Sequence, residues 1–511
     1  MTGLHNGDYL EECRQQLENL RIALNAGLDS NVWKMGAEVE IPLIDQGTGE
    51  TALSAFDLSH KIHQGQFCDC DNSPESFPGN LELNIKPQVI GADCLKEIEQ
   101  EMIKALVAIG SANMTTDING NLVRAKPIFT GISPGLTAEM FGVLTTPKQR
   151  YVQLNNTLDA LLNARGESGQ LLQFVYGDGH IVQLPRMNRT DIGMGSSIQP
   201  HIGCPAKDFA WLMNISRALM GILQSATVAS PRILGHKVPG YQEGRIWLWE
   251  ELIQMVDFDP MMGRGGYLKE GTTDGLYEAI KAQFDSNRPL ILNPELTEEC
   301  NCHHPLSALC HYMGTGWFHI RPCVAFVDGE YQPHVELRNF STGPSIPDMM
   351  SLLSVYLGLV LFFKDKGISA ESLLSYDEAR DNFYHAVEKG LDAELAWCGE
   401  RFKADKLLLD VLLPYAHQGL KGAGIDDGYV GHLERSVGKK LTAASFIDAV
   451  YEQFTNVPED VVGRGLALYM SDRPCSPIAD WCASDVGGYI ASITSEAVQD
   501  CGNATQEAAY F

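Results

Sequence analysis

The chain has 511 residues, 44% of them hydrophobic and 20% charged, so it can bury a sizeable core. A formal net charge of -27 argues against a surface for nucleic acid or an anionic membrane, and it favours cation binding. Residues 1–20 lack a basic start followed by an apolar stretch, so we expect no signal peptide and a cytoplasmic protein.

The pattern of apolar residues predicts helices and strands along the first two-thirds of the chain. In chain order we expect a helix at 8–28, a strand at 32–44, a loop at 71–80, a strand at 81–87, a helix at 92–110, a strand entering a loop at 125–134, a helix at 147–165, a strand at 195–205, a helix at 207–228 and two strands within 315–340. The turn between these last two strands is expected at Asp328–Gly329.

The last third of the chain is predicted to be mostly helical from Pro347 to about residue 455, with mixed turn and helix signals in 456–511. The longest apolar run, Met349–Phe363, has 15 residues and includes two serines. It is too short for a membrane span, so it predicts a buried helix.

The chain has 13 cysteines, an odd number that fits mostly free thiols in a reducing cytosol. Two clusters are denser: Cys68 and Cys70 form one, and the other contains Cys300, Cys302, His303, His304, Cys310 and His311. A zinc site could be built from such residues. Because C-x-C is a weaker zinc signal than paired C-x-x-C, free thiols in loops are the simpler interpretation.

The segment WKMGAEVEIPLI, residues 33–44, places Glu38 and Glu40 in an otherwise apolar run. Residues two apart in a strand point to the same face, so the two carboxylates would project side by side. Neighbouring carboxylates repel and are costly to desolvate, and a cation between them would remove both costs. A single E-x-E strand is more often a solvated face, so the cation hypothesis needs partners elsewhere in the chain.

Three further predicted strands carry polar residues in apolar surroundings: Glu82 in LELN, Gln199 and His201 in IQPHIG, and Glu336 and Arg338 in HVELRN. If the four strands share one sheet, these side chains gather on one face. Such oxygen-rich clusters suit hard cations, Mg²⁺ or Mn²⁺, which commonly bridge to substrate phosphates. Arg338 would point into the same space and balance charge on a transferring phosphoryl group, and Arg321 and Arg245 are further candidates.

At these residues the chain resembles the glutamate–cysteine ligase family, in particular its carboxylate–amine ligase branch within the glutamine synthetase-like superfamily. The resemblance covers residues 33–345 and rests on short segments that follow the family's order. These segments are GAEVEIPLID, LELNIKP, TPKQRYVQL, SSIQPHIGCP, SATVASPRILGHKVPGYQEGRIWLW, TGWFHIRP and HVELRNF. No single segment is specific, but their order is.

The resemblance implies an α+β fold in which a curved antiparallel sheet forms an active-site funnel with helices packed outside. It implies a catalytic region at 1–345 and a mostly helical C-terminal region at 346–511 packed on it. It also implies ATP and two or more Mg²⁺ ions, with Mn²⁺ as an alternative, and small-molecule substrates. The implied reaction joins the γ-carboxylate of glutamate to an amine through an acyl phosphate; with cysteine as the amine, this is the glutamate–cysteine ligase step of glutathione biosynthesis.

The family's motifs also imply roles for the matching positions of this chain. The implied metal ligands are Glu38, Glu40, Glu82 and Glu336. Arg338 is implied to contact the transferred phosphoryl group, with Glu336 beside it in catalysis. Arg321 and Arg245 are implied to contact the nucleotide or the substrate carboxylate, and Gln199 and His201 lie where the family binds its cofactor.

Two departures from the family's pattern leave the amine acceptor open. Gln199 stands where this branch usually has the first histidine of its H-V-H-V-G strand, and a neutral amide oxygen is a weaker ligand. The segment RNFSTG, 338–343, replaces R-x-x-D. A γ-glutamyl ligase for another amine is therefore a second hypothesis, and a guanidino kinase or a non-catalytic nucleotide-binding protein of the same fold is a third. The oligomeric state stays open.

Overall fold

The computed structural model describes the greater part of the chain. The described residues are 6–65, 71–140, 145–165, 172–175, 179, 181–184, 193–253, 266–286, 305–314, 316 and 318–494. The predicted cysteine clusters fall largely outside them, at Cys68, Cys70, Cys300 and Cys302, so the choice between zinc and free thiols stays open.

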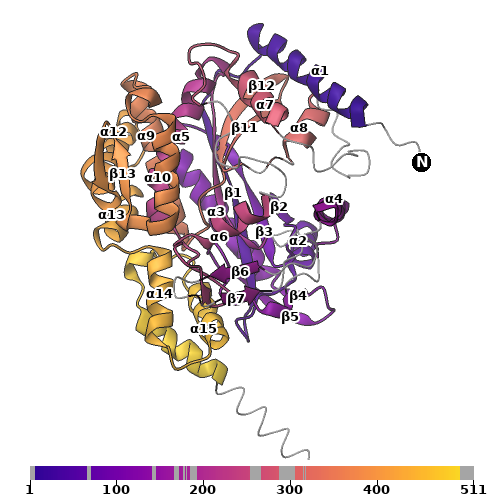
Figure 1. Ribbon diagram of the computed structural model, residues 1–511, viewed down its shortest axis with the longest axis vertical. Helices are drawn as coiled ribbons and strands as arrows, with labels where there is room; N and C mark the ends of the chain where they lie inside the picture. The colour runs from indigo at the N-terminus through magenta and orange to yellow at the C-terminus, as the bar shows by residue number, and fades with distance from the viewer. Residues whose placement is uncertain are drawn as a thin grey trace, which may run out of the picture.

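An eight-stranded antiparallel sheet lies at the centre of the molecule (Figure 1). Its strands are β1 (Lys34–Asp45), β2 (Asp71–Pro74), β3 (Asn80–Val89), β4 (Met114–Thr116), β5 (Leu122–Pro127), β8 (Ile198–Gly203), β11 (Ile320–Val327) and β12 (Glu330–Leu337). The main path runs β11–β12–β8–β1–β3–β2, and β5 pairs with both β1 and β4. Two-stranded ribbons are formed by β6 (Leu172–Val175) with β7 (Ile181–Leu184), β9 (Arg232–Ile233) with β10 (His236–Lys237), and β13 (Glu394–Trp397) with β14 (Glu400–Lys403).

The sheet has one apolar and one polar face because its strands alternate between the two kinds of residue. On β1, Val39 and Ile41 are buried in the core, and Glu38 and Glu40 alternate with them. Neighbouring strands contribute Leu81, Leu83, Ile198, Ile202, Val335 and Leu337 to the same core. This alternation fixes the register, since a shift by one residue would bury the carboxylates among the helices.

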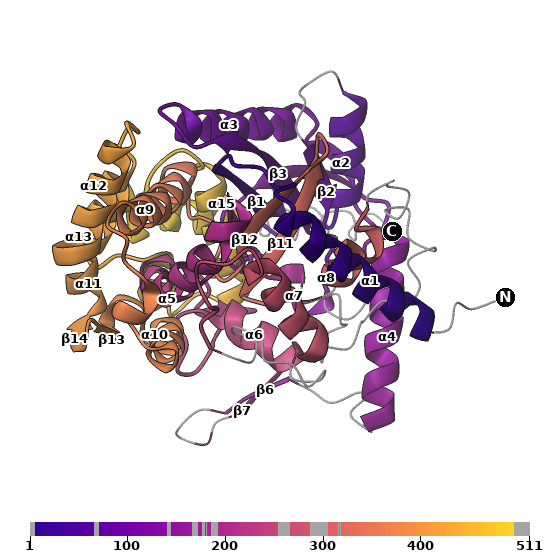
Figure 2. The same cartoon turned by 90° about the horizontal axis from the view of Figure 1, so that it is seen from above.

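The helices are α1 (Asn6–Asn25), α2 (Ala55–Gln64), α3 (Cys94–Ser111), α4 (Gln149–Arg165), α5 (Phe209–Thr227), α6 (Gly244–Ile253), α7 (Gly275–Ser286), α8 (Ser307–Met313), α9 (Ile346–Asp365), α10 (Tyr376–Lys389), α11 (Ala404–Leu407), α12 (Leu413–Gly422), α13 (Val430–Gly438), α14 (Ala443–Gln453) and α15 (Glu459–Ser471). Several of them cover the apolar face of the sheet, whereas α14 and α15 form a second apolar cluster. Helix α3 packs on β3, and α5 packs on β12. Figures 1 and 2 both show α9, α10, α12 and α13 grouped together on one side of the sheet.

The structure contains strands where the sequence predicts none. The predicted loop at 71–80 is wrong for Asp71–Pro74, which pairs with β3 as the edge strand β2. An edge strand needs hydrogen bonds on one side only, so its proline and polar residues are tolerated there. The hairpin β13–β14 likewise lies within the stretch predicted to be mostly helical.

The predicted buried helix at Met349–Phe363 is confirmed as part of α9. Among the described residues, α9 is the one helix long and apolar enough to cross a membrane, and 89% of its most apolar window is buried. Ser345 caps its first turn by accepting a hydrogen bond from the Asp348 amide at 3.3 Å. Because α9 contacts α3, α5 and α12, it lies in the same core as the sheet. The boundary at 345 between the two predicted regions stays a prediction.

Helices α9 and α12 cross at Gly358 and Gly419. A Cβ on Gly419 would lie far inside contact distance of the Gly358 carbonyl oxygen. We therefore expect Gly419→Ala to destabilise the protein by about 1–3 kcal/mol, although alanine is the better helix former. The measurement is urea unfolding. The control is Gly422→Ala in the same helix, where a Cβ would meet no atom within 4 Å, and it should not destabilise. Equal midpoints for the two variants would contradict this packing.

Asp348 links α9 to the C-terminal segment. Its Oδ2 accepts hydrogen bonds from Ser345 Oγ at 2.6 Å and from the Ile478 amide at 2.9 Å. Burial raises its pKa to about 6 from the usual 3.8. The folded state therefore holds this proton more tightly than the unfolded state, and the stability gained from it is lost as the pH rises through 6. We expect the melting temperature of Asp348→Asn, measured against wild type, to rise between pH 4 and pH 7. A difference independent of pH would contradict this assignment.

Candidate active site on the polar face of the sheet

The polar face of the sheet brings together the predicted site residues of five strands, β11, β12, β8, β1 and β3. Residues paired across antiparallel strands lie side by side, so the register places them in rows. The rows are Arg321–Glu336–His201, Gln199–Glu38–Asn84 and Glu40–Glu82. Arg338 follows directly on the end of β12, and its side chain reaches back to the same face.

The first cluster contains Glu38, His201 and Glu336, and one ligand atom from each lies within 4.8 Å of the other two. His201 Nε2 is 3.8 Å from Glu38 Oε1 and 4.0 Å from Glu336 Oε2. Burial lowers the pKa of His201 to about 3, so its ring is neutral at pH 7 and can bind a cation. Burial and the charge of Glu336 raise the pKa of Glu38 to about 7. A bound cation would favour the ionised form of Glu38.

Glu336 is fully buried and ion-paired with two arginines. Its Oε2 accepts from Arg321 Nε at 3.0 Å and from Arg321 Nη2 at 2.5 Å, and its Oε1 accepts from Arg338 Nη1 at 2.7 Å. Burial alone would raise the pKa of Glu336, but the two guanidinium groups hold it well below the usual value. Glu336 is therefore ionised at neutral pH.

The second cluster contains Glu40, Glu75 and Glu82, again with one oxygen from each within 4.8 Å of the others. Burial and the charge of Glu75 raise the pKa of Glu40 to about 7. The same causes raise the pKa of Glu82 well above its usual value. Three carboxylates this close repel one another unless a proton or a cation lies between them.

Sequence reasoning missed Glu75. It lies in the short connection between β2 and β3, where no alternation of apolar and polar residues assigns a side chain to one face. Because 71–80 was predicted to be a loop, Glu75 was not considered as a site residue. One feature of the sequence could have identified Glu75: it is an acidic residue in the short connection that leads into the strand carrying Glu82.

Glu40 is held by hydrogen bonds from β8 and the residue before it. Its Oε2 accepts from the Ser197 amide at 2.6 Å and from Ser197 Oγ at 2.9 Å, and its Oε1 accepts from Gln199 Nε2 at 2.8 Å. Gln199 is fully buried, and its Oε1 has no hydrogen-bond partner among the described residues. The same is true of Nε2 of His201. A buried oxygen and a buried nitrogen beside the five carboxylates of the two clusters are a donor set that fits hard divalent cations.

Arg338 lies between the two clusters. Besides its 2.7 Å hydrogen bond to Glu336, its Nη2 is 3.9 Å from Glu40 Oε1. Burial would lower the pKa of Arg338, but the charge of Glu336 raises it. One guanidinium group therefore touches an acid of each cluster, which suits it to bind an anion shared between them.

Arg245 lies at the start of α6 rather than on the polar face. Its Nη2 donates to the carbonyl oxygens of Arg338, at 3.3 Å, and of Asn339. The structure thus brings Arg245 next to the backbone of the predicted site and not into the two clusters. Its predicted contact with nucleotide or substrate stays a prediction.

Two further side chains on the polar face were not predicted. His334 is two residues before Glu336 on β12, and its ring stacks on His201 with centroids 5.4 Å apart. Cys323 is two residues after Arg321 on β11, and its Sγ donates to Glu336 Oε2 at 3.2 Å. The period of two that identified Glu336 would have identified both.

A pocket that is open to solvent lies beside the first cluster and, counting the solvent space at its mouth, has a volume of about 470 Å³. Glu38 and His201 line it, together with Asn84 and Lys86 of β3. Gly36 also lines it, opposite an irregularity in the pairing with β3; a Cβ there would be 3.0 Å from the Ile85 carbonyl oxygen. The face therefore holds candidate ligands and open space for a small molecule next to them.

Comparison with known proteins agrees with this architecture. No protein-family model and no curated protein sequence matches the chain. A solved structure of glutamate–cysteine ligase from Francisella tularensis, in complex with AMP, is similar over 93% of this chain and 95% of that one, with a TM-score of 0.50 and 12% sequence identity. A chain from the complex of the prokaryotic ubiquitin-like protein Pup with its ligase PafA aligns over 90% of this chain and 79% of its own, at 9% identity and a TM-score of 0.38, too low for comparing folds.

The chain has the fold of this glutamate–cysteine ligase: a curled antiparallel half-barrel sheet with surrounding helices. The predicted α+β fold class is thereby confirmed. The likeness at 12% identity is one of fold, and the activity of this chain is taken up as a proposal below.

Proposed function

We propose that the protein is an ATP- and Mg²⁺-dependent carboxylate–amine ligase. The observation that carries the proposal is the pair of adjacent carboxylate clusters joined by Arg338 on one face of the sheet. The finer proposal is that it joins the γ-carboxylate of glutamate to an amine, with cysteine as the first amine to test. The likeness in fold to a glutamate–cysteine ligase supports this choice, and the AMP in that structure supports the use of ATP.

The residues present would hold two cations. Glu38, His201 and Glu336 would hold one, and Glu40, Glu75 and Glu82 the other, with the free Oε1 of Gln199 as a further oxygen donor. Mg²⁺ bound in these places supplies positive charge that offsets the charge on the phosphates of ATP. Mn²⁺ also suits carboxylate and histidine ligands and would replace it in binding experiments.

The chemistry must overcome the poor reactivity of a carboxylate towards amines. In the proposed reaction a carboxylate oxygen of glutamate attacks the γ-phosphorus of ATP, and ADP leaves. The amine nitrogen then attacks the acyl carbon, the bond to phosphate breaks, and the nitrogen loses a proton to the surrounding solvent or a base. The amide, ADP and phosphate are the products.

Arg338 would stabilise the first step. Its guanidinium group lies between Glu336 and Glu40, and a planar fork of N–H donors matches phosphoryl oxygens. Arg321 donates to the other oxygen of Glu336, Oε2. It thereby fixes the carboxylate that orients Arg338. Both arginines hold their charge at any pH at which the enzyme would work.

The experiment is phosphate release with Mg-ATP and glutamate, with cysteine and then a panel of other amines, followed by mass spectrometry of the product. Phosphate release that depends on cysteine, with γ-glutamylcysteine formed, would support the finer proposal. Release only with another amine would keep the ligase and change its acceptor. A phosphorylated guanidino product would identify a guanidino kinase instead. ATP binding without release for every pair would favour a non-catalytic nucleotide-binding protein.

A further inference from the structure

We propose that Arg245 is a positioning residue: it holds the backbone that follows Arg338 in place, and it does not bind the nucleotide or the substrate. The catalytic meaning of this inference rests on the proposed function.

Arg245 is buried and directed at one segment of backbone. Only 5% of the residue is exposed. Its Nη2 donates to the carbonyl oxygens of Arg338 and Asn339, and its Nε lies 3.3 Å from Ser341 Oγ. To reach a ligand, this guanidinium group would have to leave buried carbonyl groups without a donor, which costs about 1–3 kcal/mol for each.

Hydrogen bonds also hold the backbone at the start of α6, from which the Arg245 side chain extends. The Arg245 amide donates to Ser230 Oγ at 3.0 Å, and Ser230 Oγ donates to Glu243. Glu243 is fully buried and also accepts from the Ala229 amide at 2.9 Å. The backbone of Arg245 is therefore held in place by hydrogen bonds. A residue that positions a neighbouring segment needs such support.

The segment held by Arg245 touches both clusters. At one end, Arg338 carries the guanidinium group that bridges them, and its amide donates to the His319 carbonyl at 2.7 Å. At the other end, Ser341 forms a bridge with Ser197, which donates two hydrogen bonds to Glu40. A shift of this segment would therefore move Arg338 against Glu336 and disturb the support of Glu40 together.

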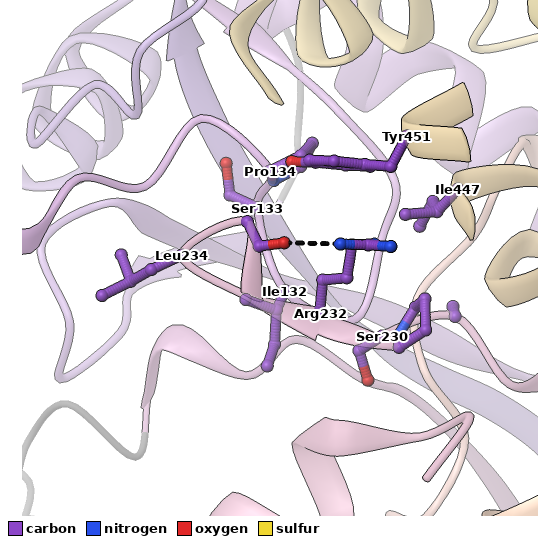
Figure 3. Close-up of a pocket in the computed structure, with 11 residues that line it drawn as sticks. Ile132, Ser133, Pro134, Ser230, Arg232, Leu234, Ile447 and Tyr451 are labelled. Atoms are coloured by element: carbon purple, nitrogen blue, oxygen red, sulfur yellow. Dashed lines mark hydrogen bonds between the residues drawn. The ribbon is translucent and has the colours of Figure 1, made fainter. Parts of the chain in front are cut away.

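Arg232 offers a matched control. It is another largely buried arginine that donates to a backbone carbonyl, that of Gly235 at 2.8 Å. Its other contacts are Asp448 at 3.1 Å, Glu459 at 3.9 Å and the ring of Tyr451, whose centroid is 4.3 Å away. Figure 3 shows Tyr451 lying over Arg232 in a small pocket against α14. Arg232 thus fixes α14 and the start of α15 to the β9–β10 hairpin, and among the described residues it forms no hydrogen bond or ion pair with 338–341.

The test compares Arg245→Gln, Arg245→Lys and Arg232→Gln with wild type by steady-state phosphate release and by hydrogen–deuterium exchange. We expect Arg245→Gln to lower kcat about 10²-fold while the KM values for ATP and glutamate stay within about threefold of wild type. Arg245→Lys should recover part of kcat, because one ammonium group replaces some of the donors. Arg232→Gln should lower the melting temperature and leave kcat unchanged.

Hydrogen–deuterium exchange tests whether Arg245 holds this segment without requiring any enzymatic activity. The amides of Arg338 and Thr342 donate to the carbonyls of His319 and Ser196. They should exchange faster in Arg245→Gln than in wild type or Arg232→Gln. If Arg245→Gln does not fold, Arg245→Lys decides both measurements by the same criteria.

A raised KM with unchanged kcat would overturn the inference, because it would show direct binding of a ligand by Arg245. Unchanged exchange at Arg338 and Thr342 would overturn it too. If wild type releases no phosphate with any substrate pair, the proposed function fails by itself, and the exchange comparison still decides whether Arg245 holds the segment.

Discussion

Replacing Glu38 with glutamine is expected to lower turnover about 10³-fold, which corresponds to about 4 kcal/mol of lost transition-state stabilisation. The amide keeps the shape of the side chain but removes its negative charge from the first cluster, so the affinity for a divalent cation falls. The fold should not suffer. Burial raises the pKa of Glu38 to about 7, so its ionised form is disfavoured in the folded protein, and a neutral side chain relieves that cost.

The measurement is the rate of phosphate release at fixed Mg²⁺, together with the melting temperature. We expect an unchanged or higher melting temperature and some recovery of rate at high Mg²⁺. The control is Glu400→Gln on the β14 strand, where the side chain is exposed and far from the sheet in sequence and topology. A rate for Glu38→Gln within threefold of the control would remove Glu38 from the cation site.

Replacing Glu336 with glutamine should cost both activity and stability. Glu336 is fully buried and accepts from two guanidinium groups, so its loss leaves Arg321 and Arg338 as uncompensated buried charges. Breaking such a pair by removing one partner costs about 3–5 kcal/mol. Turnover should fall at least as far as in Glu38→Gln, because the first cluster loses a ligand and Arg338 loses the group that orients it.

Urea unfolding and phosphate release measure the two effects separately. Glu38→Gln is the matched variant, since the same chemical change in the same cluster should leave stability intact. If Glu336→Gln unfolds at the same urea concentration as Glu38→Gln, the arginine pairs do not contribute to the fold as described. If Glu336→Gln instead retains wild-type turnover, Glu336 has no part in the site.

The sheet and much of the site could be predicted because both follow the period of two. Val39 and Glu40 lie on opposite faces of one strand, as their apolar and charged side chains predict. The same alternation on β8 and β12 brings His201 and Glu336 into one row. The register then follows from burying one face only.

The residues that sequence reasoning missed or assigned differently lie where that period does not apply. Glu75 enters the second cluster from a connection between strands, and only the pairing of β2 with β3 brings it there. Arg245 approaches from the start of a helix nearly a hundred positions before Arg338, so no spacing in the sequence relates the two. Gln199 was identified as a departure, but its bond to Glu40 and its free oxygen depend on side-chain geometry.

The central measurement is the binding of Mn²⁺ to the wild-type chain in the presence of a non-hydrolysable ATP analogue. Isothermal titration calorimetry and electron paramagnetic resonance give the number and affinity of the bound ions. We expect two Mn²⁺ ions per chain, with Glu38→Gln weakening one site and Glu82→Gln weakening the other. No binding, or binding that neither substitution changes, would contradict the claim that the polar face of this sheet is a two-cation site for ATP.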